Sequence, residues 1–361
     1  MCVPSTKRLI LPLQGLRGLC YCLIFAGHVQ FLWGWPAFGV SVFMVMSGFL
    51  MMLHHGQGHD GLSWKSSFFF AAARIRKIYG LHVLTTGGIF LLYACMGGMP
   101  AVREHVASLL LNLLLVQAWV PDTHIAISLN GVNWYLSAAL FAYFCFPWLQ
   151  GCISRLRSGQ GIAAALAAVL LAQVCFAMLM AWLEGRNSDV FVWSMYLFPM
   201  FRLGDFTAGC LAGYWFACCG GRHMLETAGR KWIAAAWLAA AAVLYIAMKL
   251  IQPEPVGIAA MALQNWSTGY IVPALMLVIL AAGGRGMAAK ILGCRILAGL
   301  GNISAFTYLL HSTVILCSGV MMQSAGIVAE GWQRYALWGA EFGLTCVLAA
   351  GYSHLQQYRK G

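Results

Sequence analysis

The sequence predicts an all-α integral membrane protein with about ten transmembrane helices and both termini in the cytoplasm. The composition is the first reason, because 61% of the 361 residues are hydrophobic and only 9% are charged, unlike a water-soluble globule. The second is that apolar runs of about 20 residues, long enough to cross a bilayer as helices, recur throughout the chain. An open sheet would leave backbone groups unpaired in lipid, so the spans are helical.

These runs divide the chain into one transmembrane domain, from about residue 9 to residue 356 of residues 1–361, with no appended soluble domain and no internal repeat. The expected spans are 9–33, 37–54, 79–98, 133–151, 161–183, 196–219, 231–251, 265–284, 299–322 and 335–356. Residues 99–132 are expected to form an outer-side excursion, in which the short apolar segment 105–119 makes an interfacial or re-entrant helix.

The distribution of positive charge sets the predicted orientation. Lysine and arginine concentrate in cytoplasmic connections of membrane proteins. All the basic connections fall on one side if 105–119 does not cross, and the later ones change sides if it does. These connections are the N-terminus, 55–78, 152–160, 220–231, 285–298 and the C-terminal tail. The same distribution argues against a nucleic-acid partner despite the net charge of +12, because the charge is not gathered on one face.

The first span carries two polar side chains of particular interest. Arg17 and His28 are eleven positions apart, which brings them to within about 20° of the same helix face and about 16 Å apart along its axis. A charged residue in a span usually marks a ligand site or a pathway. The alternatives are that Arg17 extends to the headgroups and that His28 is a neutral packing residue bonded to a neighbouring helix.

Six sequence segments in fixed order carry most of the recognisable pattern of the chain: LQGLRG at 13–18, GVSVFMVMSGFL at 39–50, ARIRKIYGLHVL at 73–84, NGVNWYLSAALFAYFCFP at 130–147, FRLGDFTAG at 201–209 and LGNISAFTYLLH at 300–311. Together they resemble the membrane-bound acyltransferase 3 family, whose members O-acylate cell-surface carbohydrates. They extend over nearly the entire chain. One departure is that Ala138 and Ala139 stand where the family usually has a glutamate.

The resemblance implies an O-acyltransferase that takes an acyl group, expected to be acetyl, from acyl-CoA and transfers it to a carbohydrate hydroxyl. The acceptor would be of the lipopolysaccharide, capsule or exopolysaccharide type, and the protein would be multi-pass in a bacterial inner membrane. Such a transfer needs a base for the hydroxyl and a group that holds the donor. His28 is the natural base, and Arg17 suits a phosphate or carbonyl of coenzyme A. Direct transfer and an acyl-histidine intermediate both remain open.

Further residues are expected to bind donor or acceptor on the strength of the same resemblance. They are Ser47, Arg74, Lys77, Trp134, Ser137, Arg202, Asp205, Tyr308 and His311. Simpler roles compete for several of them. Arg74 and Lys77 also fit a positively charged cytoplasmic anchor, and Arg202 with Asp205 also fits a structural ion pair three residues apart. For His311, hydrogen-bonded packing is the simpler role.

No bound cofactor and no metal site are expected. The thirteen cysteines show no Cys-x-x-Cys spacing. The segment HGQGHD at 55–60 has a His-x4-Asp spacing that soluble glycerolipid acyltransferases also use, but it lacks their scaffold. The competing function is a transporter or flippase that moves an acyl group or a lipid-linked glycan without making bonds, since intramembrane charge suits that role as well.

Overall fold

The computed structural model describes residues 10–32, 35–56, 63–156, 158–185, 188–250 and 268–358, and in these ranges every regular element is helical. The long helices are α1 (Leu11–His28), α2 (Trp35–His55), α3 (Trp64–Leu113), α5 (Trp134–Ile153), α6 (Gly159–Glu184), α8 (Pro199–Cys218), α10 (Arg230–Leu250), α12 (Thr268–Gly283), α14 (Arg295–Ser324) and α15 (Trp332–Tyr358). The short ones are η1 (Gln117–Trp119), α4 (Thr123–Ala126), α7 (Asp189–Val192), η2 (Trp193–Leu197), α9 (Gly221–Thr227) and α13 (Met287–Leu292). The all-α prediction is confirmed for this part of the chain.

Each of the ten expected spans overlaps one of the long helices. By length and composition, six of the described helices can cross a membrane: α2, α3, α5, α6, α10 and α14. The apolar helix α12 is shorter than these. Polar residues reduce the hydropathy of α1, which contains Arg17, and of α8, which contains Arg202 and Asp205. The number of ten spans and the cytoplasmic position of both termini therefore stay predictions.

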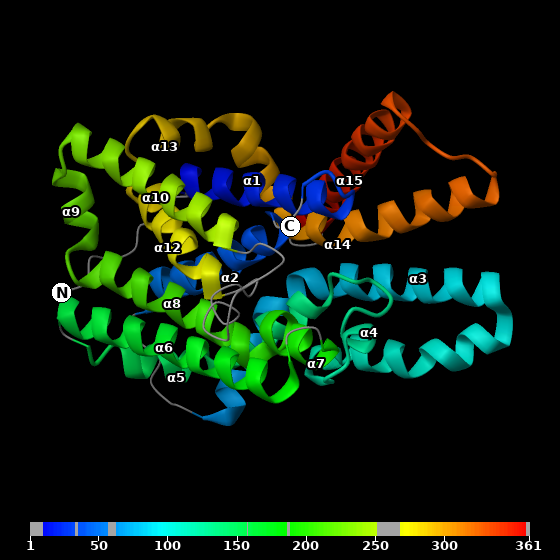
Figure 1. Cartoon of the computed structure of the whole chain (residues 1–361), viewed down its shortest axis with the longest axis horizontal. Helices are drawn as coiled ribbons and strands as arrows, with labels where there is room; N and C mark the ends of the chain where they lie inside the picture. The colour runs from blue at the N-terminus through cyan, green and yellow to red at the C-terminus, as the bar shows by residue number, and fades with distance from the viewer. Residues whose placement is uncertain are drawn as a thin grey trace.

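Glycines let the central helices approach backbone to backbone. α1 lies against α14, where a Cβ on Gly18 would stand 2.2 Å from the Leu297 carbonyl oxygen and one on Gly301 would stand 1.8 Å from that of Gln14. α2 lies against α8 in the same way, with Gly48 against Phe206. Close approach through small residues is the usual mode of helix association in membranes. Figure 1 shows α1 and α2 at the centre of the bundle, with α6, α8, α10 and α12 to one side.

Helix α3 is a hairpin of two arms. The break lies at Gly98, whose φ of 62° is readily adopted by glycine. The arms run antiparallel, since the rings of Tyr93 and His105 are 5.0 Å apart and the Tyr79 hydroxyl donates to the Leu113 carbonyl at 2.8 Å. The hairpin extends beyond the bundle beside α14 (Figure 1). Residues 99–113 thus fold back along the preceding arm, within the segment 99–132 that was expected to contain an interfacial or re-entrant helix.

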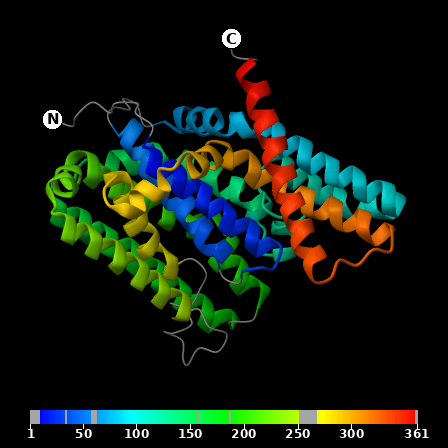
Figure 2. The ribbon, with the colours of Figure 1, turned by 90° about the horizontal axis from the view of Figure 1, so that it is seen from above.

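The chain that follows the hairpin is anchored by buried side-chain hydrogen bonds. Asn130 donates to the Leu309 carbonyl of α14 at 2.9 Å, and Asn133 donates to the Thr86 hydroxyl of α3 at 2.8 Å. Both asparagines are almost fully buried. These bonds fix the start of α5 between α3 and α14. Helix α15 packs against α14, where Ser318 donates to the Glu341 carboxylate, and it ends at the top of the view in Figure 2.

Candidate functional site

A cavity of about 300 Å³ opens between α1, α2, α3, α5 and α14. Its polar lining residues are Arg17, Ser47, His54, His55, Arg74, Tyr135, Tyr143, Ser304 and Tyr308. Its apolar lining residues are Phe43, Met46, Leu50, Met51, Ile75, Ile78, Leu136, Ala139 and Ala305. Of the expected site residues, the structure therefore brings Arg17, Ser47, Arg74 and Tyr308 together around one space.

Arg17 reaches this cavity because of how α1 is seated. Gly15 faces the Leu292 carbonyl of α13, and Gly18 faces the Leu297 carbonyl of α14, so α1 presses its glycine face onto these helices. Arg17 lies between the two glycines in sequence and extends from a neighbouring face into the cavity. Its side chain is only partly exposed.

The cavity is electropositive. Arg17 and Arg74 both line it, and no described lining residue is acidic. Five hydroxyl groups, from two serines and three tyrosines, supply neutral hydrogen-bond donors and acceptors. Guanidinium groups bind phosphate and carboxylate oxygens through paired N–H donors, so the lining suits an anionic ligand with a polar chain.

The rim of the cavity contains residues whose role sequence reasoning missed. Arg74 Nη2 lies 2.6 Å from His55 Nε2, and the Arg74 guanidinium stacks 4.8 Å from the centre of the Phe70 ring. His54 lines the rim as well. Sequence analysis considered His55 only as part of the His-x4-Asp spacing at 55–60. The sequence did contain a signal for this rim. His54 and His55 lie at the end of one expected span, and Arg74 precedes the next, so these side chains were expected on the same side of the membrane.

A pair of histidines lies at the other end of α1. The His28 and His311 rings meet edge to face, with centroids 4.7 Å apart and an interplanar angle of 80°. His28 ends α1 with an exposed side chain, whereas His311 on α14 is fully buried. Neither lines the cavity that contains Arg17. The structure therefore separates Arg17 from His28, although both project from one helix.

An aromatic cluster in the wall of the cavity also contacts the histidine pair. Tyr308 packs against Tyr135 and Phe43, with ring centroids 5.4 and 6.2 Å apart. On its other side Tyr308 lies 5.8 Å from the His311 ring. Its hydroxyl donates to the Val132 carbonyl at 3.3 Å. Tyr308 and His311, expected only as accessory residues, thus connect the two parts of the site.

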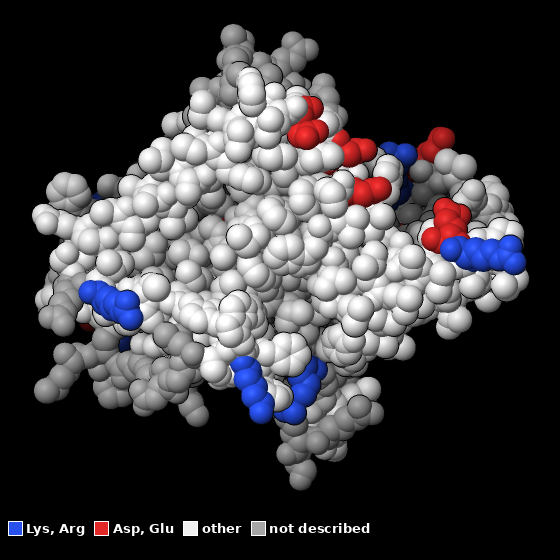
Figure 3. Space-filling view, turned by 90° about the horizontal axis from the view of Figure 1, so that it is seen from below, with Lys and Arg blue, Asp and Glu red and all other residues white. Residues whose placement is uncertain are grey.

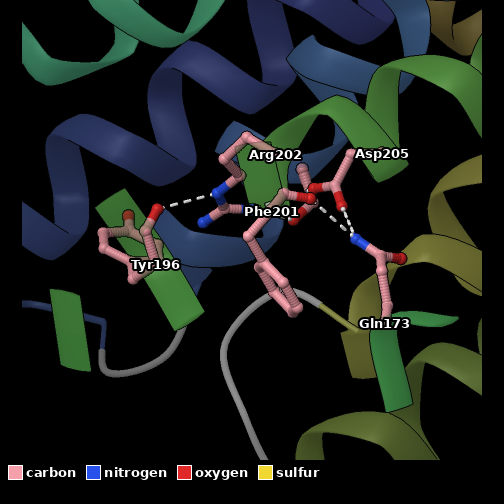
Figure 4. A network of polar contacts seen from close by, with 6 residues as sticks. Gln173, Tyr196, Phe201, Arg202 and Asp205 are labelled. Carbon is pink, nitrogen blue, oxygen red and sulfur yellow. Dashed lines mark hydrogen bonds and ion pairs between the residues drawn. The ribbon is translucent and has the colours of Figure 1, made fainter. Parts of the chain in front are cut away.

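Arg202 and Asp205 form a buried network outside the cavity (Figure 4). Both side chains are fully buried, and Arg202 Nη1 lies 2.9 Å from Asp205 Oδ2. Gln173 of α6 donates to Asp205 Oδ1 at 3.1 Å, and Arg202 Nε donates to the Tyr196 carbonyl at 2.8 Å. These contacts tie α8 to α6 and η2, which is the structural role considered for the pair.

Three further expected residues also lie outside the cavity. Trp134 is buried with its ring 5.4 Å from the Arg202 guanidinium, and Ser137 is buried on the same helix. Lys77 is exposed, with its ammonium 5.5 Å from the centre of the Phe306 ring. Among the described residues, no group of three or more His, Cys, Asp or Glu side chains is placed to hold a metal ion. His59 and Asp60 of the HGQGHD segment lie outside the described residues.

Comparison with known proteins decides the family. The acyltransferase 3 family model, described as an acyltransferase domain, matches residues 11–353. The chain belongs to the acyltransferase 3 family. It is similar to the acyltransferase MdmB of Streptomyces mycarofaciens, with 31% identity over 110 residues, which is 30% of this chain and 27% of that protein. The chain thus matches only about a quarter of the length of that curated relative, and no solved structure matches it.

The chain is thus a member of the acyltransferase 3 family, and six of its described helices are long and apolar enough to cross a membrane. The resemblance stated from the six segments is confirmed, since the match covers nearly the whole chain. The family match does not assign roles to individual residues. The electropositive cavity and the histidine pair are the two places in the described chain where charged or titratable side chains could act on a substrate.

Proposed function

We propose that this acyltransferase transfers an acyl group, expected to be acetyl, from acyl-CoA to a hydroxyl of an exported or cell-surface carbohydrate. The observation that carries the proposal is the division of the site along α1. An arginine-lined cavity, none of whose described lining residues is acidic, lies at one part of this helix, and an exposed histidine ends it. The first suits the phosphates and polar arm of coenzyme A, and the second suits a hydroxyl acceptor.

In this proposal the cavity opens to the cytoplasm, where acyl-CoA is available. Arg74, with His55 beside it at the rim, would hold phosphate oxygens, and Arg17 deeper in the cavity would hold a phosphate or the thioester carbonyl. Ser47 and Tyr308 would offer hydroxyls to the polar arm. The donor is a substrate, and the proposal includes no resident cofactor or metal.

At the outer end, His28 would act as the general base. Its Nδ1 donates to the Ile24 carbonyl at 2.8 Å, because a carbonyl can only accept. In the neutral ring, Nε2 then has a free lone pair with which it can take the proton of the sugar hydroxyl. The hydroxyl oxygen would attack the acyl carbonyl, held either on coenzyme A or on an acyl-enzyme, and the ester would form; over the whole reaction coenzyme A is released as the thiol. Acceptors of the lipopolysaccharide, capsule or exopolysaccharide type at a bacterial inner membrane fit this arrangement.

The test is the alkali-labile acyl ester on washed cells that express the protein or its His28→Asn variant. The asparagine amide can still donate to the Ile24 carbonyl, but it cannot accept a proton as imidazole does. We expect ester formation to fall by about 100-fold or more at equal membrane abundance. Near-normal esterification by His28→Asn would rule out His28 as the base.

The distance between the cavity and His28 also fits the competing function, a carrier that moves an acyl group or a lipid-linked glycan without making a bond. Purified protein in vesicles separates the two. An acyltransferase consumes acetyl-CoA when acceptor-bearing membrane extract is added and releases free CoA in proportion to ester formed. A carrier leaves the thioester intact.

A further inference from the structure

The histidine pair has a defined arrangement of ring protons. His28 Nδ1 and His311 Nδ1 lie 2.8 and 3.2 Å from the carbonyl oxygens of Ile24 and Thr307. Because carbonyl oxygens only accept, both Nδ1 atoms carry the proton in the neutral rings. Each Nε2 atom therefore has a free lone pair, and the site contains two imidazole nitrogens able to act as base or nucleophile.

The Nε2 atom of His311 is unusual because it is buried. His311 is 0% exposed, and its Nε2 has no hydrogen-bond partner among the described residues. Buried polar atoms are nearly always paired, and exceptions frequently have a chemical role. A histidine used only for packing between helices would gain from pairing both of its nitrogens. Packing alone therefore does not account for His311.

His311 lies between the two parts of the site, the cavity that contains Arg17 and the exposed end of α1 at His28. Tyr308 lines the cavity that contains Arg17, and its ring lies 5.8 Å from that of His311. His28 lies on the other side, 4.7 Å from His311 between ring centroids. The order from cavity to exposed end is thus Tyr308, His311, His28. Since Arg17 and His28 are about 16 Å apart along α1, an acyl group bound near Arg17 needs an intermediate position to reach an acceptor at His28.

We infer that His311 is a second catalytic residue, which carries the acyl group as an acyl-imidazole between the donor cavity and the acceptor activated by His28. The inference rests on the proposed function and divides its chemistry between two histidines. His311 serves the donor side because it is buried next to Tyr308, and His28 serves the acceptor side because it is exposed.

The transfer then has two balanced steps. In the first, His311 Nε2 attacks the thioester carbonyl, the N–C bond forms, the C–S bond breaks, and coenzyme A leaves as the thiolate while the ring becomes an acyl-imidazolium. In the second, the sugar hydroxyl gives its proton to His28 Nε2 and its oxygen attacks the acyl carbonyl. The ester forms, the N–C bond breaks, and His311 returns to the neutral ring. The proton on His28 finally neutralises the thiolate charge through the solvent.

Isotope exchange tests this division, because an acyl-enzyme exchanges its leaving group without any acceptor. The purified full chain in detergent is incubated with acetyl-CoA and isotope-labelled free CoA, and label entering acetyl-CoA is measured. His28→Asn and His311→Asn form a matched pair, since each asparagine can keep the donor to its helix carbonyl while losing the Nε2 lone pair. Equal membrane abundance and melting temperature control for folding.

We expect wild type and His28→Asn to catalyse exchange, and His311→Asn to lose it by about 100-fold or more. Surface ester should be lost in both variants. The tryptic peptide containing His311 should gain the mass of one acetyl group when His28→Asn is quenched with acetyl-CoA present. Exchange that persists in His311→Asn, or that is lost in His28→Asn, would overturn the inference.

Failure of the inference differs from failure of the proposed function. If the wild-type protein forms surface ester but shows no exchange, it transfers the acyl group directly from acetyl-CoA. This result would overturn the role of His311 but leave the proposed acyltransferase function intact. Wild type that neither exchanges label nor forms ester from acetyl-CoA overturns both.

Discussion

At the scale of single residues, the site depends on where two arginines and two histidines are placed by their helices. Arg17 and Arg74 project into one cavity from α1 and α3, whereas His28 and His311 meet at the far end of α1. We propose that the part with the arginines binds an anion and that the part with the histidines carries out the proton or acyl chemistry. Each assignment makes its own prediction.

Arg17→Lys should reduce transfer while the protein still accumulates in the membrane. Lysine keeps the charge but loses the paired N–H donors that grip a phosphate or carbonyl. A hydrogen bond to a charged group contributes about 1.5–3 kcal/mol, so we expect kcat/KM for acetyl-CoA to fall by about 10- to 100-fold. Arg76→Lys is the matched control, because Arg76 is exposed and does not line the cavity. Equal rates for the two variants would make Arg17 a membrane anchor only.

Asp205→Asn should act on stability. It removes the charge that balances the fully buried Arg202, and breaking a buried pair costs about 3–5 kcal/mol. We expect a lower melting temperature in detergent and lower membrane abundance. The double variant Arg202→Met/Asp205→Asn should recover part of both, since no uncompensated charge remains. If Asp205→Asn keeps full stability and loses only activity, the pair binds acceptor instead.

At the scale of secondary structure elements, the contact between α1 and α14 sets the distance between the histidines. Gly18 and Gly301 allow this contact, because a Cβ on either would overlap a carbonyl oxygen of the opposite helix. The helices run side by side from Gly18 and Gly301 to His28 and His311. If a larger side chain at Gly18 or Gly301 pushed α1 and α14 apart, the His28 and His311 rings would therefore move apart as well.

Gly301→Ala and Gly299→Ala form a matched pair on α14. A Cβ at Gly301 would lie 1.8 Å from the Gln14 carbonyl oxygen, whereas a Cβ at Gly299 meets nothing within 4 Å. Overpacking of this kind costs about 1–3 kcal/mol. We expect Gly301→Ala to lower both the melting temperature and acyl transfer, and Gly299→Ala to change neither. Equal melting temperatures for the two would show that the helices adjust without cost.

At the scale of the whole molecule, charge is divided between the two ends of the bundle. Figure 3 shows one face on which Asp and Glu side chains gather at the upper right, while Lys and Arg side chains lie mainly along the lower and left edges. Most acidic residues of the described chain lie in connections expected on the outer side: Glu104, Asp122, Glu184, Asp189 and Glu330. This division fits a cytoplasmic side rich in positive charge.

Reporter fusions test the resulting topology. Fusions after residues 156, 225 and 290 should report cytoplasm, and a fusion after residue 329 should report the outer side. The reason is that the connections 152–160, 220–231 and 285–298 carry arginine and lysine, which concentrate on the cytoplasmic side, whereas the connection between α14 and α15 lies one expected span away from them. A fusion after residue 156 that reports the outer side would mean that 105–119 crosses the membrane.

The sequence by itself determined the class of structure and the family. A composition of 61% hydrophobic residues in recurrent runs leaves helices as the structure that satisfies the backbone in lipid, and six ordered segments indicated the family that matches residues 11–353. It also placed Arg17 and His28 on one face of one helix, because helical periodicity is local. These properties need no knowledge of which helices touch.

Only the tertiary structure decided which residues share a space. Helical periodicity indicates the direction of a side chain but not the helix opposite it, which depends on packing between segments distant in sequence. Arg17 and Tyr308 thus line one cavity, while Arg202 pairs with Asp205 outside it. His311 follows His28 by 283 positions in sequence yet meets it at 4.7 Å, because Gly18 and Gly301 allow α1 and α14 to lie against each other.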